Sequence, residues 1–301
     1  MVINQSNLRG IFSGFNALFN KGFESMEAQY TKVAMIVPSS SRDETYGWLG
    51  QFPSLREWVG EREIQNLSAN GYTIKNKDFE LTVGVPRNDI MDDKIGLYAP
   101  LIQNMGESAK IHPDTIVFAL LARGFEEKCY DGTNFFSKNH PLKKEDKTVQ
   151  SNMGTRKLSA DSFAEAKSAM MTLKSEKGQN LKIVPDLLVV APQNEAKARE
   201  ILFADMILGS TNVNKGTCDL LVSPDLSDHG DQWYLLSTKR SVRPLVFQDR
   251  EKPRFTSKTS DTDDNVFFQN EYLYGVNARY NAGYGLWQLA FGSTGEEEAM
   301  G

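Results

Sequence analysis

Cysteine and histidine are the scarcest chemically reactive residues in this chain of 301 residues. The two cysteines, Cys129 and Cys218, are too few for a disulfide scaffold or a cysteine-built zinc site, and they suit a reducing compartment. The three histidines, His112, His140 and His229, stand far apart and have no neighbour at metal-ligand spacing. We therefore expect two free thiols, no metal and no cofactor.

Long apolar runs, phosphate-binding loops and an excess of basic charge are also missing. No run of 18 apolar residues exists, and residues 1–13 lack the segments of a signal peptide, so we expect a soluble, unexported protein with no membrane partner. Gly283 and Gly285 lie between strand-like aromatics and predict a turn, because no helix start follows them. The net charge of −5 disfavours high-affinity nucleic-acid binding and leaves room only for loose, sequence-independent contact.

What the chain does contain is the composition of a folded protein, with 40% hydrophobic and 24% charged residues. Its first clear pattern predicts an amphipathic helix near the N-terminus, whose apolar face could cover the chain's own core or a partner. The apolar residues of this face recur at spacings of four, three, four, four and three, and they are Leu8, Phe12, Phe15, Phe19, Phe23 and Met26.

A long β-hairpin is predicted between residues 42 and 85. Residues 56–66 favour one strand, residues 68–71 favour a turn, and Tyr72 begins the returning strand. The apolar side chains of the returning strand change face across residues 75–78, which a bulge or bend would explain. We expect the base of the hairpin to join a core sheet while its tip projects, and a projecting ribbon of two strands needs a neighbour.

After the hairpin, apolar residues at every fourth position predict a long helix over residues 93–124, kinked or broken at Pro113. Residues 155–240 then alternate helical and strand patterns around a small central sheet, with Ser159 or Asp161 as a helix cap. The last third favours strands, with a polar loop before them and a frayed acidic tail after them. The ranges are 244–248, 266–269, 272–278 and 285–291 for the strands, 250–265 for the loop and 293–301 for the tail.

The sharpest enzymatic hypothesis is a hydrolase with Cys129 as nucleophile, His140 as base and Asn139 or Asp131 as the group that orients it. The alternative is an ordinary thiol and a loop histidine, which we favour because no activating helix terminus surrounds either residue. The acidic pairs at residues 92–93 and 263–264 are better explained by a helix dipole and by solvent than by a cation. We therefore expect that this protein is not an enzyme.

Several segments in the same order resemble the Mu-like gpT head-subunit family, from about Phe15 to Gly292. The motifs that carry the resemblance are Pro38-Ser-Ser-Ser, Tyr46-Gly-Trp-Leu-Gly50, Leu55-Arg-Glu-Trp-Val-Gly60, Asn70-Gly-Tyr-Thr-Ile74, Phe79-Glu-Leu-Thr-Val83, Arg87-Asn-Asp-Ile90, Cys129-Tyr-Asp-Gly-Thr-Asn-Phe-Phe136, Asn139-His-Pro141, Tyr274-Gly-Val276 and Tyr284-Gly-Leu-Trp287.

The resemblance implies an α+β fold of the phage major capsid type, named after phage Hong Kong ninety-seven. It implies an N-terminal arm, an extended loop, a peripheral domain with a spine helix at about 93–124, and an axial domain. The corresponding ranges are 1–41 for the arm, 42–85 for the loop, 86–154 with 241–292 for the peripheral domain, 155–240 for the axial domain and 293–301 for the tail.

The same resemblance implies a capsid subunit that assembles with copies of itself into hexamers and pentamers around packaged double-stranded DNA. We expect assembly in the bacterial host cytoplasm, residence in the virion capsid, and a portal as partner. Because the first helix begins within ten residues of Met1, we expect a separate scaffold protein rather than an N-terminal scaffolding segment, although a trimmed precursor is the alternative. Rival functions are a shell of an encapsulating compartment and a tail-associated shell of the same fold.

Aromatic side chains are the expected contact residues between subunits, because buried aromatics carry much of the energy of protein interfaces. They come from the N-terminal helix and from the extended loop. The expected set is Phe12, Phe15, Phe19, Trp48, Trp58 and Tyr72.

Overall fold

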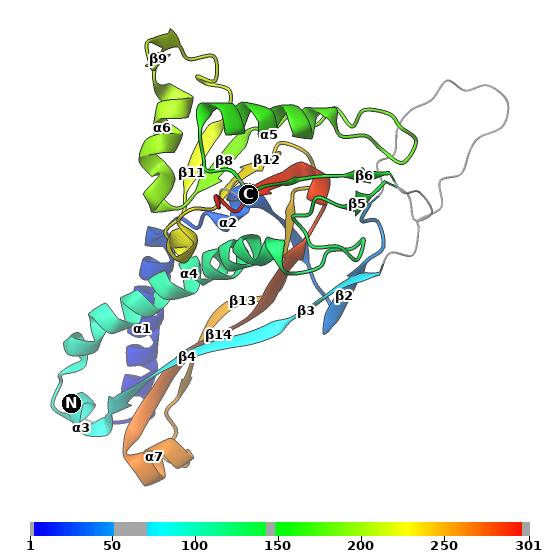
Figure 1. Ribbon diagram of the computed structural model, residues 1–301. Helices are drawn as coiled ribbons and strands as arrows, with labels where there is room; N and C mark the ends of the chain where they lie inside the picture. Colours follow the sequence, from blue (N-terminus) through cyan, green and yellow to red (C-terminus); the bar gives the residue numbers. More distant parts are fainter. Residues whose placement is uncertain (1–2, 51–70, 143–147, 297–301) are drawn as a thin grey trace.

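The computed structural model describes residues 3–50, 71–142 and 148–296. In them the chain forms an elongated α+β molecule, with a four-stranded sheet in its lower half and a five-stranded sheet in its upper half (Figure 1). A large cluster of buried apolar side chains surrounds the upper sheet and the upper end of the lower one. A smaller cluster lies between the lower sheet and the helices that cover it.

The lower sheet has the strand order β1-β13-β14-β4. β13 is antiparallel to β14, β14 is antiparallel to β4, and β1 runs parallel to β13 along the opposite edge. Side chains of β14 alternate between more and less buried, as they do in a strand with one covered face. The strands are β1 (Ala34–Pro38), β4 (Lys77–Pro86), β13 (Leu245–Lys258) and β14 (Glu271–Tyr284).

Two predictions for this part of the chain were wrong. The polar segment 250–265 is not all loop, because β13 continues to Lys258. β1 ends opposite Asp249, so the later part of β13 has a free edge where polar side chains reach solvent. Residues 266–269 are not a strand but belong to helix α7 (Asp264–Gln269), which Asn270 ends in a left-handed conformation with φ 54°.

The N-terminal helix α1 (Gln5–Ser25) confirms the predicted amphipathic pattern and packs on its own chain. Asn4 caps it, since its side-chain oxygen accepts a hydrogen bond from the Asn7 amide at 2.8 Å. Its buried face meets helix α4 (Ala99–Ala122) where a glycine of each helix touches the backbone of the other. A Cβ on Gly22 would lie 2.0 Å from the Gln103 carbonyl oxygen, so the contact has no room for a side chain.

The expected long helix over 93–124 begins later than predicted. Asp93 has φ 60°, and it separates helix α3 (Arg87–Met91) from the 3-10 turn η1 (Ile95–Tyr98) that leads into α4. α4 then runs to Ala122 as one helix that includes Pro113, so the helix is not broken there, and η2 (Arg123–Phe125) closes it.

The base of the predicted hairpin is a short ladder of β2 (Asp43–Tyr46) with β3 (Tyr72–Lys75). The predicted change of face is confirmed, because β3 pairs with β2 whereas β4, which follows Asn76, pairs with β14. Residues 77–85 therefore belong to the lower sheet rather than to a free ribbon. The predicted strand over 56–66 and Trp58 lie outside the described residues.

The upper sheet has the order β11-β8-β12-β15-β7, with helices α5 and α6 packed beside it (Figure 1). Ser159 caps α5, as one of the two predicted candidates. The sheet extends beyond residues 155–240, because β7 and β15 also belong to it. Its elements are β7 (Met153–Gly154), α5 (Ala160–Thr172), β8 (Leu187–Val190), α6 (Glu195–Phe203), β11 (Asp219–Val222), β12 (Trp233–Leu236) and β15 (Ala290–Ser293).

Short elements connect these layers. They are α2 (Tyr30–Val33), β5 (His140–Pro141), β6 (Val149–Gln150), η3 (Pro192–Asn194), β9 (Met206–Ile207), β10 (Ser210–Thr211), η4 (Pro224–His229) and η5 (Trp287–Leu289).

Candidate assembly surfaces

The residues of the hydrolase hypothesis do come together in the structure. The ligand atoms of Cys129, Asp131 and His140 all lie within 4.8 Å of one another. Asp131 stands between the other two, since the Cys129 thiol donates to its Oδ1 at 3.2 Å and His140 Nδ1 lies 2.6 Å from its Oδ2. Cys129 and His140 are 5% and 0% exposed, so a substrate has no access to either.

The electrostatics of this cluster also oppose nucleophilic chemistry. Burial, followed by the negative charge of Asp131, raises the pKa of the Cys129 thiol far above its ordinary value, and a protonated thiol is a weak nucleophile. Burial alone would raise the pKa of Asp131 as well. The hydrogen bonds from His140 and Thr133 outweigh burial and lower that pKa, so Asp131 remains an ionised acceptor.

The cluster instead joins the loop after α4 to the upper sheet. The His140 ring stacks on Trp287 with centroids 3.9 Å apart, and its Nε2 lies 3.1 Å from Asn152 Oδ1. Asn152 Nδ2 donates to the carbonyl oxygens of Phe135, Trp287 and Ala290. These bonds tie three chain segments together, namely the loop after α4, the residues around Asn152 and the segment from η5 to β15, which is a structural role.

Two expected contact residues, Phe15 and Phe19, lie inside their own subunit. They are 2% and 3% exposed. Phe15 meets Tyr274 edge-on at 4.9 Å, and Phe19 stacks on Phe255 at 5.3 Å. Within the single subunit both rings therefore belong to the lower core, and their contact with a second subunit stays a prediction.

Phe12, Trp48 and Tyr72 keep part of their side chains at the surface. Phe12 stacks at the edge of the lower core, with its ring centroid 5.6 Å from that of Phe255. Trp48 lies edge-on to Tyr46, with centroids 6.1 Å apart. The Tyr72 hydroxyl accepts a hydrogen bond from the Tyr284 amide at 3.1 Å. Trp58 lies outside the described residues.

The base of the extended loop is held by buried amides. The Tyr46 hydroxyl donates to Gln248 Oε1 at 2.9 Å, and Gln248 Nε2 donates to Asn76 Oδ1 at 2.7 Å. Asn76 Nδ2 in turn donates to Ser39 Oγ and to the Ser41 carbonyl. Because these groups are buried and bonded to one another, they hold the ladder of β2 with β3 to the lower sheet.

Sequence reasoning missed two exposed apolar tips at opposite ends of the molecule (Figure 1). At the lower end Phe267 and Phe268 of α7 are 76% and 77% exposed. At the upper end Leu208, between β9 and β10, is 100% exposed. The sequence predicts residues 266–269 as a strand, and a strand in the sheet would have buried part of the Phe267 and Phe268 side chains.

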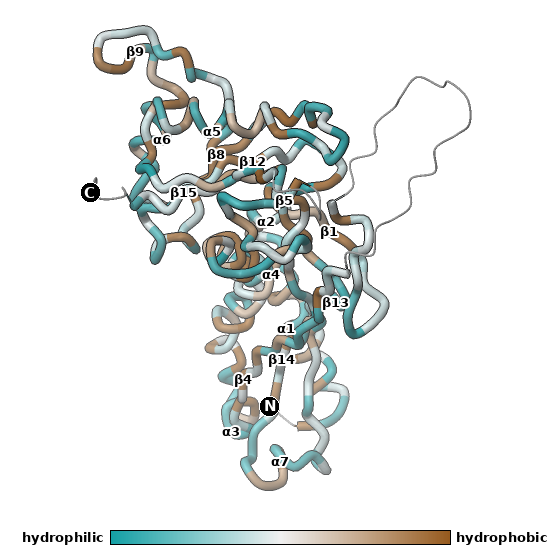
Figure 2. The backbone as a smooth tube through the Cα atoms, turned by 45° about the vertical axis from the view of Figure 1, so that its right-hand side comes forward, coloured by the Kyte–Doolittle hydropathy of each residue, from teal (hydrophilic) through white to brown (hydrophobic). Residues whose placement is uncertain are grey.

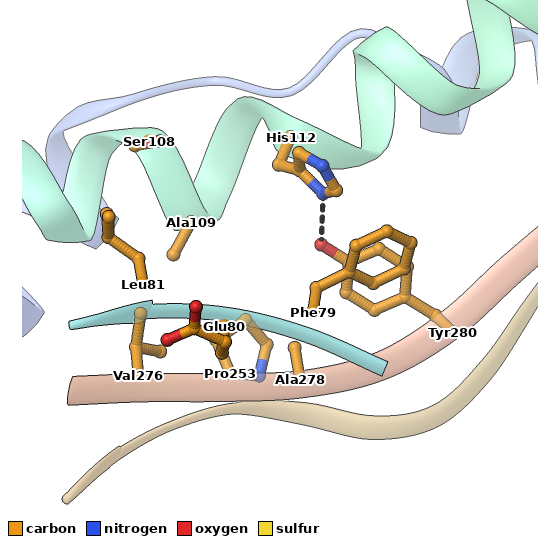
Figure 3. A pocket seen from close by; sticks show the side chains of 10 residues that line it. All are labelled: Phe79, Glu80, Leu81, Ser108, Ala109, His112, Pro253, Val276, Ala278 and Tyr280. Atoms are coloured by element: carbon orange, nitrogen blue, oxygen red, sulfur yellow. Dashed lines mark hydrogen bonds between the residues drawn. The ribbon is translucent and has the colours of Figure 1, made fainter. Parts of the chain in front are cut away.

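A cavity of about 110 Å³ separates α4 from β4 and β14 (Figure 3). His112 Nδ1 lies 2.8 Å from the Tyr280 hydroxyl across it, and Phe79 packs against both rings. It is smaller than the cavities of several hundred Å³ that hold drug-sized ligands. A larger groove of about 630 Å³ runs between α1, α4 and β13, where Lys110 Nζ lies 4.8 Å above the Phe23 ring.

In the described part of the chain, no helix has the length and apolar character needed to cross a bilayer.

Known proteins resemble the whole chain. The family described as Mu-like prophage major head subunit gpT matches residues 8–157, 154–226 and 222–300. The major capsid protein of Escherichia phage Mu is 36% identical over 296 residues, which cover 98% of this chain and 76% of that protein. The Mu-like prophage FluMu major head subunit of Haemophilus influenzae is 32% identical over 289 residues, with 96% and 73% covered.

Among solved structures, the procapsid of bacteriophage JBD30 superposes with a TM-score of 0.63 and 38% identity, covering 99% of this chain and 78% of that chain. The expected phage major capsid fold is therefore confirmed. The family and these relatives are structural proteins and not enzymes. From its sequence and its fold alike, the chain belongs to the Mu-like prophage major head subunit family.

Proposed function

We propose that this major capsid protein assembles as hexamers and pentamers into an icosahedral shell that encloses phage or prophage DNA. The observation that carries the proposal is the likeness over 99% of the chain to a subunit of the JBD30 procapsid. Exposed apolar tips at both ends of an elongated subunit also support it, because a closed shell needs more than one kind of contact between identical copies.

The extended loop is the proposed contact with the adjacent subunit. The hydrogen bond between Gln248 and Asn76 holds the base of this predicted loop, residues 42–85, to the body of the subunit, which supports a contact in a defined place. Trp48 and Trp58 are the aromatic residues proposed to contact the neighbour, with Phe12 and Tyr72 contributing their exposed parts. Residues 1–41 act as the arm, 86–154 with 241–292 as the peripheral domain, and 155–240 as the axial domain.

Other partners follow from the same role. A separate scaffold protein would direct assembly in the host cytoplasm, and a portal would occupy one vertex. With a net charge of −5, the subunit would contact packaged DNA loosely and without sequence preference. The mature protein resides in the virion capsid.

Negative-stain electron microscopy of the purified full chain, alone and co-expressed with neighbouring phage genes, tests the proposal. Closed shells, or rings of five and six, are expected. A monodisperse monomer under both conditions would contradict the proposal. Tubes, or shells filled with protein cargo, would favour the tail-associated or compartment alternatives.

The loop contact is tested with Trp48→Ala and the conservative control Trp48→Phe. We expect Trp48→Ala to reduce the yield of particles by about tenfold or more, because removing an aromatic from an interface centre typically costs over 1 kcal/mol per contact and a shell repeats the contact. Trp48→Phe keeps a ring and should assemble. Equal yields from all three proteins, with equal melting temperatures, would contradict a contact role for Trp48.

A further inference from the structure

Three side chains that carry metal-binding atoms meet beside the end of α4. The donor atoms of Cys129, Asp131 and His140 lie within 4.8 Å of one another. They come from two segments, the turn that follows α4 and the first residue of β5. Figure 2 shows β5 between α4 and the strands of the upper sheet. The set is therefore assembled by folding, and the spacing of these residues in the sequence gives no sign of it.

A tight turn places Cys129 and Asp131 on the same side of the chain. The Cys129 amide donates to the Thr133 carbonyl at 2.8 Å, and the Gly132 amide donates to the Cys129 carbonyl at 3.1 Å. Gly132 has φ 85°, a conformation that glycine adopts without steric cost. The Cys129 thiol and Asp131 Oδ1 face each other at 3.2 Å as a result. Two donor atoms are thus held close together by backbone bonds.

The hydrogen bonds of Asn152 fix the tautomer of His140. Asn152 Nδ2 donates to three carbonyl oxygens, and Asn152 Oδ1 accepts from the Ser137 amide at 2.9 Å. Because Oδ1 is thereby identified as the acceptor, His140 Nε2, 3.1 Å away, carries a hydrogen and donates it. The other ring nitrogen, Nδ1, faces Asp131. Histidines that bind metals have this arrangement, with one nitrogen on the ion and the other donating to a protein oxygen.

A positive charge is required between His140 and Asp131. Nδ1 lies 2.6 Å from Asp131 Oδ2. With the hydrogen of the neutral ring on Nε2, this contact would join two acceptors, which repel each other. The Thr133 hydroxyl does not relieve the repulsion, because it lies beside Asp131 Oδ1 and Nδ1 rather than between Nδ1 and Oδ2. Either a second proton on the ring or a metal ion supplies the charge.

The set of donor atoms favours zinc among the biological cations. Thiolate, imidazole and carboxylate together suit Zn²⁺, whereas Mg²⁺ and Ca²⁺ take oxygen ligands. Donors on a tetrahedral zinc ion lie about 3.3–3.7 Å apart, since the bonds measure about 2.0–2.3 Å. The separations of 2.6 and 3.2 Å reach these values through side-chain movements of about 0.7 Å or less. The Thr133 hydroxyl, 2.8 Å from Asp131 Oδ1 and 2.9 Å from His140 Nδ1, marks the position of the fourth donor.

Zinc also leaves the net charge of this buried group unchanged. Without metal, the group holds a thiol, a carboxylate and an imidazolium, whose charges sum to zero. Zn²⁺ replaces the thiol proton and the Nδ1 proton, and the resulting thiolate and the carboxylate balance its charge. Cys129 and His140 are 5% and 0% exposed, and burial does not oppose an exchange that brings no net charge into the interior.

We propose that Cys129, Asp131 and His140 bind one Zn²⁺ ion that links the turn after α4 to β5. The role of the ion is structural, because the site is closed to a substrate. The sequence predicts no metal, and the proposal departs from that prediction because the ligands come together only in the fold. All three ligands belong to one subunit, so the site does not depend on assembly.

The test is the zinc content of the tag-free full chain, expressed with added zinc, purified without chelators and measured by inductively coupled plasma mass spectrometry. The wild type should hold one zinc ion per subunit. Cys129→Ser keeps a group that can donate to Asp131, so it preserves the hydrogen bond but removes the thiolate. It should bind zinc at least about a hundredfold more weakly, because even groups outside the ligand set contribute about 10–100-fold to metal affinity.

Cys218→Ser is the matched control. Cys218 is also buried, at 7% exposed, but its thiol faces the Pro185 carbonyl at 3.5 Å and has no part in the site. This variant should retain one zinc ion. A wild type without zinc would overturn the proposal and assign the charge between His140 and Asp131 to a proton. Equal zinc contents in all three proteins would also overturn it, because the metal would then lie elsewhere.

Cobalt gives a second readout that does not depend on how well Cys129→Ser folds. Co²⁺ substituted for Zn²⁺ should give a thiolate-to-cobalt charge-transfer absorption in the wild type and in Cys218→Ser. A wild type that binds cobalt without this band would overturn the role of Cys129. Removal of the metal with a chelator should lower the melting temperature of the same two proteins, since a ligand that binds the folded state stabilises it. An unchanged melting temperature would overturn the structural role of the ion.

Discussion

Helix α4 packs closely against α1 on one face and less closely against the lower sheet on the other. Toward α1 its Gly106 touches backbone, and a Cβ there would lie 2.1 Å from the Phe19 carbonyl oxygen. Toward β4 and β14 the same helix borders the cavity of about 110 Å³ beside Ala109 and His112 (Figure 3). Interiors are close-packed on average, so α4 is packed closely against α1 and less closely against the sheet.

The largest expected effect on stability comes from a substitution that disrupts the close contact between α4 and α1. Gly106→Ala should lower the free energy of unfolding by about 2–3 kcal/mol, because the new methyl group would push the α1 backbone away from α4. Equilibrium unfolding in urea measures this change. Gly14→Ala is the control, since Gly14 is an exposed glycine of α1 with no atom within 4 Å of its Cβ position. It should raise stability by up to about 1 kcal/mol. Equal effects of the two substitutions would show that the helices are not in backbone contact.

A substitution that fills the cavity between α4 and the lower sheet should have a smaller effect on stability, of opposite sign. Ala109→Leu places added methyl groups in the cavity and should raise the free energy of unfolding by about 1 kcal/mol. Ala164→Leu on the exposed side of α5 adds the same atoms without burial and should change stability little. A loss of stability in Ala109→Leu would mean that the cavity walls cannot receive a side chain.

The smallest expected effect is a dependence of stability on pH that arises at His112, beside the cavity between α4 and the lower sheet. Burial lowers the pKa of His112 below its ordinary value of 6.5. The unfolded chain therefore binds a proton more readily than the folded one, and stability should fall as the pH drops below 6.5. The titratable groups beside this ring are the Tyr280 hydroxyl, at 2.8 Å, and Glu80 on the cavity wall. Thermal unfolding between pH 7 and pH 5 should show a shallower slope for His112→Gln than for the wild type. An unchanged slope would assign the pH dependence to other groups.

Local patterns in the sequence predicted the elements whose side-chain period is strong. The spacing of Phe12, Phe15 and Phe19 predicted α1, and the change of apolar face at residues 75–78 predicted the break at Asn76. The same patterns could not identify the partner of α1. Gly22 and Gly106 are unremarkable in sequence, and their role depends on two helices far apart in the chain coming together.

Contacts between residues distant in sequence determine the features that local sequence patterns did not predict. Val266, Phe267 and Phe268 have strand propensity, yet the turn ending at Asn270 makes them helical. The cluster of Cys129, Asp131 and His140 was visible as a set of reactive residue types. Only their burial, the hydrogen bond that Thr133 donates to Asp131 and the one that Asn152 Oδ1 accepts from His140 show that the set is structural. Leu208 gave no signal, because a strained φ is a property of the folded backbone.

The glycine contact between α1 and α4 also has a mechanical consequence. Two rods that touch through their backbones cannot slide past each other by rotamer changes, since no layer of side chains lies between them. A displacement of α4 near Gly106 would therefore pass to helix α1 (Gln5–Ser25) through backbone contact, with no side chain between the two to absorb it.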